Sequence, residues 1–265
     1  MGDLSAFIRP QKSIERAKQA LYNAKKTFFE FMDGQNIEPI QVFDQKTGYY
    51  CLKTVITGPV PDNIEAQISS AVTTTRHAFD QIIFSACEAI GKPTKGLYYP
   101  WVDEERLLAA KLFSNKQNKE IIPADLWDVI RAQEPYPHSD DTQRGNTLIR
   151  NMAILANRKH TVGIEIGCFP AINKTEIEAH GYVKEMIFGT EMIIRSENLE
   201  FEFLRWKGQS KFNYRFSPIF HIIFNQDAPG DLGERTAMLC VQRFIEAAQK
   251  AIDDFRQRAK ELAAI

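Results

Sequence analysis

Apolar residues recur every three or four positions in two long stretches of the first third of the chain. From about Lys12 to Met32 they form one stripe (Ile14, Ala17, Leu21, Ala24, Phe28 and Phe31). From about Asp62 to Ile90 a broader stripe follows the same period (Ile64, Ile68, Val72, Phe79, Ile82, Ile83, Ala86 and Ile90). This spacing predicts two amphipathic helices, each with one face in the core.

Between these helices the pattern changes to that of strands. Residues 37–43 and 49–57 are rich in β-branched and aromatic side chains, and the turn-forming segment 44–48, which ends in Gly48, joins them. Pro59 and Pro61 follow the second run and end it. The pattern predicts an early β-hairpin at 37–57.

The middle of the chain predicts shorter elements. An aromatic connector at 97–101 precedes two helices, at about 104–115 and 124–133, and the prolines of 134–141 exclude a helix there. A further helix is predicted at about 142–160 from an apolar stripe (Leu148, Met152, Leu155 and Ala156).

After His160 the period becomes that of strands. Alternating or clustered apolar residues occupy 164–166, 182–188, 191–195, 199–206 and 212–224, and turn residues such as Gly181 and Gly208 separate or interrupt them. This pattern predicts an antiparallel sheet of roughly four or five strands. We expect no strand before His160 other than the hairpin.

The chain closes with a helix from about Leu232 to Ala263. Its apolar residues alternate steps of three and four (Met238, Val241, Ile245, Ala248, Ile252, Phe255, Ala259 and Leu262). This seven-residue repeat favours a left-handed packing seam. The seam packs either against the chain's own helices or against a second chain, which would make a homo-oligomer.

Together these elements predict an α+β fold, in which long N-terminal, central and C-terminal helices pack with an antiparallel sheet and an early hairpin. We expect a single domain over 1–265, with a helical part at about 1–160, a β part at about 161–228 and the closing helix at about 231–264.

Composition narrows the function classes only slightly. Lys and Arg (33) nearly balance Asp and Glu (34), so no global field indicates nucleic acid or membrane. No apolar run has the length of a signal peptide or a membrane span, which favours a cytoplasmic protein. The four cysteines lack metal-ligand spacing and are expected to be small buried residues. We predict no metal and no cofactor.

Common catalytic motifs are absent from the sequence. It contains no G-x-x-x-x-G-K-[ST], G-x-G-x-x-G, G-x-S-x-G or H-E-x-x-H, and no two histidines stand four apart. The chain therefore does not carry the usual signatures of a P-loop enzyme, a dinucleotide-binding enzyme, a serine hydrolase or a zinc protease.

Two polar groups flank the helical stripes. Arg76 and Asp80, one turn apart, can pair with each other in a structural role. The helix at 142–160 ends in Asn157, Arg158, Lys159 and His160, whose cations suit the negative end of the helix dipole. Alternatively, if the two helices are neighbours, their polar flanks meet and Arg76 comes within reach of Asn157 or His160. Arginine and histidine together suit phosphate binding and proton transfer.

Short motifs at these residues carry a resemblance. The segment 75–81 matches the helix pattern L-R-S-A-L-D-H at Arg76, Ala78 and Asp80, and 156–160 matches the ending N-x-x-D-K-H at Lys159 and His160. An aromatic-Pro pair at 99–100 and a Q-E-P-Y segment that ends in Tyr136 match the intervening pieces, the latter with one extra residue. The chain thus resembles a broad family of uncharacterised bacterial and phage-borne proteins over most of its length. The family brings no established activity.

A weaker resemblance is to the HEPN superfamily of helical ribonucleases. The active motif of that superfamily has an arginine, a polar residue and, after a short gap, a histidine. Arg76 and His77 match its start, but Gln81 stands where the histidine would complete it. Cleavage of RNA would then need a histidine from another helix, such as His160.

Two hypotheses of function remain. In the first, the protein is a binding or effector module that acts on RNA or a nucleotide, with Arg76 and His160 as catalytic candidates and four binding candidates (Asp80, Tyr136, Asn157 and Lys159). In the second, the protein has a structural role or binds another protein, and the same residues only join helices.

Overall fold

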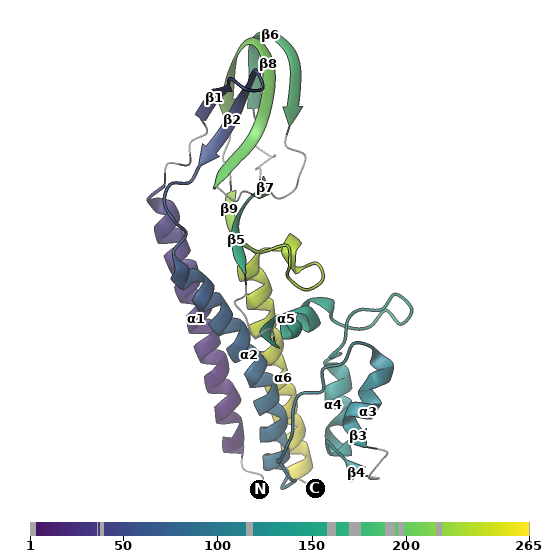
Figure 1. Cartoon of the computed structure of the whole chain (residues 1–265). Helices are drawn as coiled ribbons and strands as arrows, with labels where there is room; N and C mark the ends of the chain where they lie inside the picture. The colour runs from purple at the N-terminus through teal and green to yellow at the C-terminus, as the bar shows by residue number, and fades with distance from the viewer. Residues whose placement is uncertain are drawn as a thin grey trace.

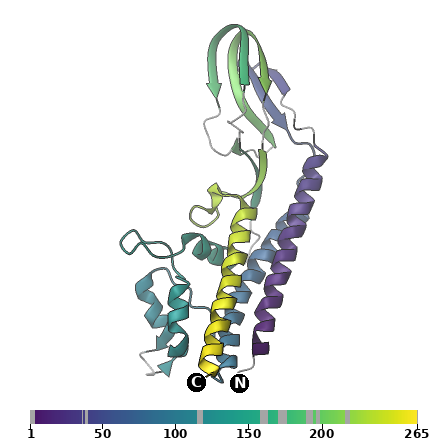
Figure 2. The same cartoon turned by 180° about the vertical axis from the view of Figure 1, so that it is seen from behind.

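The molecule consists of a long helical bundle with a β lobe beyond one end, and a smaller group of short helices at its side (Figure 1). The computed structural model describes residues 4–35, 37, 40–114, 119–157, 163–169, 176–188, 194–195, 199–215 and 219–264. Both chain ends lie at the end of the bundle that is far from the β lobe (Figures 1 and 2). The predicted α+β class is confirmed.

The elements follow one another as helices, hairpin, helices, strands and a closing helix. The helices are α1 (Ile8–Asp33), α2 (Asp62–Ala89), α3 (Leu108–Leu112), α4 (Trp127–Ala132), α5 (Thr147–Asn157) and α6 (Ala237–Ala263). The strands are β1 (Ile40–Asp44), β2 (Tyr49–Val55), β3 (Phe113–Ser114), β4 (Lys119–Glu120), β5 (Ile164–Phe169), β6 (Glu176–Phe188), β7 (Ile194–Arg195), β8 (Glu200–Arg215) and β9 (Ile219–Phe224).

Helices α1, α2 and α6 form the bundle because each has one apolar face. α1 and α2 pack together along their lengths in opposite directions, and α6 packs against both (Figure 1). Phe79 of α2 stacks on Phe244 of α6 with ring centroids 5.5 Å apart. A polar contact also joins α1 to α2, where Ser13 Oγ donates to Gln81 Oε1 at 2.8 Å. Within the described ranges, no helix is long and apolar enough to span a bilayer.

The seven-residue repeat of α6 lies inside the chain. Six of its eight members are buried, and Met238 and Leu262 pack at the edge of the core. The repeat therefore docks on the chain's own helices, which is one of the two alternatives that the sequence left open. It leaves no apolar seam of α6 free for a coiled coil.

The β lobe is built on a four-stranded antiparallel sheet of order β1-β2-β8-β6. The predicted hairpin supplies β1 and β2, and Tyr50 of β2 lies opposite Trp206 of β8. A second, three-stranded sheet of order β7-β5-β9 lies nearer the bundle (Figure 1). The late strands are thus divided between two sheets, and the early hairpin extends one of them.

Strands β6 and β8 bend over the top of the lobe (Figures 1 and 2). Gly208 of β8 pairs with Val183 of β6 next to a shift in register; it has a φ of +131°, and a Cβ there would lie 2.2 Å from the carbonyl oxygen of Tyr182. Only glycine fits this backbone conformation and this close approach. A small second core (Leu52, Leu204 and Trp206) forms within the lobe.

Several details differ from the sequence-based expectations. The runs predicted as strands at 199–206 and 212–224 are instead divided into one long strand, β8, and the shorter β9. α5 begins at Thr147 rather than near Thr142, because Gln143 and Gly145 have φ values of +53° and +106°, which an α-helix does not allow. The predicted end of this helix, residues 158–160, lies outside the described residues. A two-residue ladder, β3 with β4, also stands before His160, where we predicted no strand beyond the hairpin.

The four cysteines are all buried and unpaired, as expected for small apolar residues (Cys51, Cys87, Cys168 and Cys240). Burial raises the pKa of Cys87 and Cys240 to about 11 and that of Cys168 to about 12. These thiols are therefore protonated near neutral pH, which argues against a nucleophilic role.

Candidate functional site

Arg76 and Asp80 lie on the flank of α2 that faces the connector between α2 and α3. Arg76 Nη1 is 2.7 Å from Asp80 Oδ1, and the two side chains are 12% and 24% exposed. The guanidinium carbon also lies 5.5 Å from the ring centroid of Trp101. Nε and Nη1 are buried without a well-directed hydrogen bond, so charge attraction and the ring contact hold the arginine.

The connector is held in place by hydrogen bonds from two helices. Asp80 Oδ1 accepts a hydrogen bond from the backbone N–H of Tyr99 at 2.8 Å. Arg150 of α5 donates from Nε to the carbonyl oxygen of Val102 at 3.0 Å. The connector is thereby fixed between α2 and α5, which are neighbours in the bundle.

A cleft of about 220 Å³ opens beside the connector. Phe79, Tyr99 and Trp101 form one wall, and their ring centroids are 4.6 to 4.9 Å apart. The rest of the lining comes from the end of α4, the loop after it, the start of α5, and α6 (Ala132, Gln133, Glu134, Gly145, Asn146, Ile149, Ala247 and Lys250). An aromatic wall opposite a few polar groups is typical of small-ligand sites.

The loop after α4 brings Glu134 and Gly145 together. Glu134 has a φ of +48°, and its carboxylate accepts hydrogen bonds from Gly145 N at 2.9 Å and from Arg144 Nε at 3.2 Å. At Gly145 a Cβ would lie 2.1 Å from the carbonyl oxygen of Pro137, so only glycine fits. These contacts fix the loop wall of the cleft.

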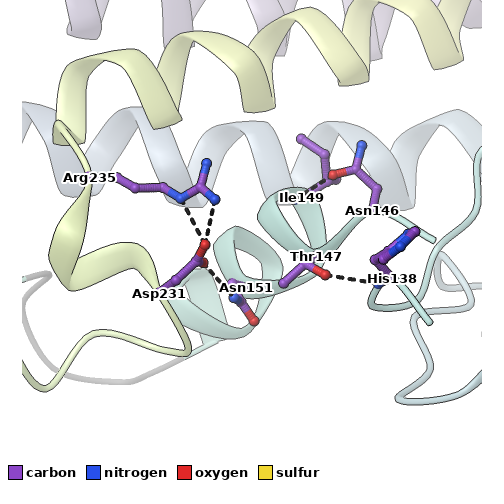
Figure 3. Close-up of polar contacts among 7 residues, drawn as sticks. All are labelled: His138, Asn146, Thr147, Ile149, Asn151, Asp231 and Arg235. Atoms are coloured by element: carbon purple, nitrogen blue, oxygen red, sulfur yellow. Dashed lines mark hydrogen bonds and ion pairs between the residues drawn. The ribbon is translucent and has the colours of Figure 1, made fainter. Parts of the chain in front are cut away.

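The first half of helix α5 is anchored by polar contacts (Figure 3). At its start Asn146 Oδ1 accepts a hydrogen bond from Ile149 N at 3.1 Å, which caps the helix. In the next turn Asn151 Nδ2 is 3.5 Å from Asp231 Oδ1, and Asp231 in turn pairs with Arg235. The cleft residues at the start of α5 therefore stand on a fixed element.

Charges at the cleft balance. Glu134 and Lys250 are the ionisable carboxylate and ammonium groups of its described lining. Lys250 Nζ lies 2.6 Å from Asp254 Oδ2, which also accepts a hydrogen bond from Gln133 Nε2 at 2.6 Å. Burial raises the pKa of Tyr99 well above its usual value, so its hydroxyl stays neutral. The arrangement favours an uncharged ligand.

A larger hollow, of about 700 Å³, runs along the outer face of α2. Its described lining comes from that one helix (Asp62, Glu65, Ala66, Ser69, Ser70, Thr73, Thr74 and His77). One helix face cannot enclose a ligand, whereas the smaller cleft is lined from five separate segments of the chain. We therefore place the candidate site in the cleft.

The sequence-based candidates lie in different places. Arg76 and Asp80 stand behind the aromatic wall. Tyr136 is 1% exposed, and burial together with Glu105 raises its pKa to about 12, although its hydroxyl makes no well-directed hydrogen bond. Asn157 is exposed at the last position of α5.

The ion-pair partner of Arg76 is Asp80, and no hydrogen bond between Arg76 and Asn157 is found among the described residues. Lys159 and His160 lie outside the described residues, so the expected meeting of Arg76 with His160 stays a prediction. Sequence reasoning did not select Trp101, Glu134, Asn146 or Lys250 for the site. The signal for Trp101 was present in the aromatic connector at 97–101, because large aromatic side chains so close together need to be covered by other parts of the chain.

Comparison with known proteins adds no functional assignment. No family model matches the chain. No curated protein matches it, and no solved structure does. The geometry of the cleft is therefore the basis on which a function can be proposed.

Proposed function

We propose that the protein is a binding module that holds an uncharged planar ligand, a nucleobase, in the cleft between the connector and α6. The base belongs either to a free nucleoside or to single-stranded RNA. The observation that carries the proposal is the aromatic wall of Phe79, Tyr99 and Trp101 opposite the polar groups of the loop and α6.

The chemistry of the lining supports a base over other small ligands. Flat heterocycles stack on aromatic side chains and are read by hydrogen bonds to their edges. Trp101 also carries a cation–π contact with Arg76, which holds its ring in the wall of the cleft. The volume of about 220 Å³ is below the roughly 300–1,000 Å³ of sites for drug-sized ligands, which suits a ligand of the size of a base or nucleoside.

Binding is favoured over catalysis by the state of the cleft carboxylate. Both oxygens of Glu134 already accept hydrogen bonds, from Arg144 and Gly145. A carboxylate held in this way positions a loop better than it accepts a proton. Among the described residues, the cleft lining offers no phosphate clamp, because its ammonium group is paired with Asp254.

The test measures binding of the four common nucleosides and of short single-stranded RNA to the whole chain. Trp101 provides a fluorescence signal, because a base stacked against its ring would quench it, and calorimetry gives an independent affinity. Ala247→Phe places a ring in the cleft and removes no polar contact. We expect it to weaken binding at least about tenfold, which corresponds to about 1.4 kcal/mol.

The matched control is Ala66→Phe, which places the same ring in the larger hollow on α2. It should leave binding unchanged. If the wild-type chain binds none of the nucleosides and no RNA, the proposal is wrong. If Ala66→Phe abolishes binding and Ala247→Phe does not, the site is the hollow on α2 and not the cleft.

A further inference from the structure

Three large apolar side chains are exposed on neighbouring flanks of α1 and α6. Tyr22 and Phe29 of α1 are 61% and 60% exposed, and Leu239 of α6 is 53% exposed. Tyr22 and Phe29 are seven positions apart, so they project from the same side of the helix. Exposed apolar side chains that gather in this way often mark a contact surface.

A groove of about 300 Å³ runs between the two helices on this side. Its floor is apolar, because Leu21 of α1 and Ile245 of α6 are 5% and 3% exposed. Its rims carry Tyr22 and polar side chains (Lys18, Lys25, Gln242 and Glu246). The groove therefore offers an apolar strip framed by hydrogen-bonding and charged groups, which is the usual anatomy of a protein interface.

The two rims carry opposite charges. Lys18 and Lys25 stand on the α1 rim, and Glu246 stands on the α6 rim. Lys25 Nζ donates to Gln242 Oε1 at 3.1 Å, whereas Lys18 forms no ion pair with any residue that the structure describes. The side chain of Glu246 is 49% exposed, and it pairs with Arg243 of the same helix at 3.3 Å and accepts a hydrogen bond from Gln242 Nε2 at 3.0 Å. Because exposed pairs of this kind contribute little to stability, Glu246 can exchange them for a lysine of a second chain. A surface with one cationic and one anionic rim is complementary to a copy of itself.

We propose that this groove is the interface of a homodimer whose two-fold axis runs parallel to α1 and α6. Such an axis places α1 of one protomer on α6 of its partner at the same height. Lys18 and Lys25 then face Glu246 of the partner subunit, and the exposed rings cover the two grooves. A two-fold axis across the helices would instead place α1 on α1 and set lysines against lysines.

The test is the mass of the whole chain in solution by light scattering and sedimentation, with 30.3 kDa as the mass of one chain. Twice that mass is expected for the wild type. Tyr22→Glu should raise the dissociation constant of the dimer at least about tenfold. Tyr182→Glu is the matched control, because Tyr182 is 71% exposed on the distant β lobe, and it should leave the dimer intact.

A charge exchange tests the orientation. Glu246→Lys alone should weaken the dimer, and combining it with Lys18→Glu and Lys25→Glu should restore it. Melting curves check that each variant is folded. The proposal is overturned if the wild type has the mass of one chain at every concentration, if Tyr22→Glu leaves the dimer intact, or if the charge exchange fails to restore it. None of these outcomes depends on whether the cleft binds a base.

Discussion

Replacing Arg76 with methionine removes the charge of the Arg76–Asp80 pair and keeps an aliphatic chain against Trp101. The pair lies 2.7 Å apart, and its side chains are 12% and 24% exposed. Asp80 would keep its hydrogen bond from Tyr99 N but lose its counter-charge in a largely buried place. We therefore expect the variant to unfold more easily and the connector to be the first part affected.

The expected loss in the free energy of unfolding depends on how far the ion pair is buried. An exposed ion pair contributes about 0–1 kcal/mol, and breaking a buried one costs about 3–5 kcal/mol. This pair lies between those limits, and loss of the cation–π contact with Trp101 adds about 0.5–1 kcal/mol. We expect Arg76→Met to lower the free energy of unfolding by about 2–3 kcal/mol. For a chain of this size, that corresponds to a fall in Tm of about 4–12 °C.

The assay is urea unfolding followed by circular dichroism, together with thermal melting. Lys26→Met is the matched control, because Lys26 and Glu30 form an ion pair of the same helical spacing with side chains 60% and 65% exposed. It should cost no more than about 0.5 kcal/mol. If Arg76→Met costs no more than Lys26→Met, the pair does not hold the connector and our interpretation of Arg76 is wrong.

Three further outcomes follow from the fold. Gly208→Ala should lower the free energy of unfolding in urea by at least about 2 kcal/mol, because φ at this position is +131° and the added Cβ would lie 2.2 Å from a carbonyl oxygen. Gly48→Ala is the control: Gly48 also has a positive φ but has open space around it, so the change should cost about 1 kcal/mol. Ile245→Asp should unfold the chain by circular dichroism, because the side chain is 3% exposed in the internal seam and burying a carboxylate costs several kcal/mol. Burial lowers the pKa of His221 below its usual 6.5, so the unfolded chain takes up this proton first as the pH falls. The contribution of neutral His221 to the free energy of unfolding should be fully present above about pH 6.5 and should decrease as the pH falls below that value. His221→Gln should make this decrease smaller in urea titrations at a series of pH values below about 6.5.

The helices and the hairpin could be predicted because their signals are local. The apolar stripe of α2 sets its length to within a residue or so, and the run from Tyr49 onward reads as a strand by itself. The partner of that strand could not be predicted in the same way. Tyr50 pairs with Trp206, which lies far along the chain, and the two segments show no pattern that singles out one another. The start of α5 was misplaced because Gln143 adopts a positive φ, which residue type alone does not indicate.

The sequence directed attention to Arg76 and Asp80 as groups that act on a ligand, and their geometry suggests a different contribution to the same region. Their spacing made the pair predictable, but its partners are set by tertiary structure: Asp80 accepts a hydrogen bond from Tyr99, and Arg76 lies over Trp101. Those two rings form the wall of the cleft in which we place the ligand. The opposite wall depends on Glu134 in a left-handed conformation and on Gly145 pressed against the backbone at Pro137, neither of which a motif search would select. In this view the arginine and the aspartate build the site by fixing its aromatic wall, and the residues that would touch the ligand are ordinary side chains gathered from five separate segments.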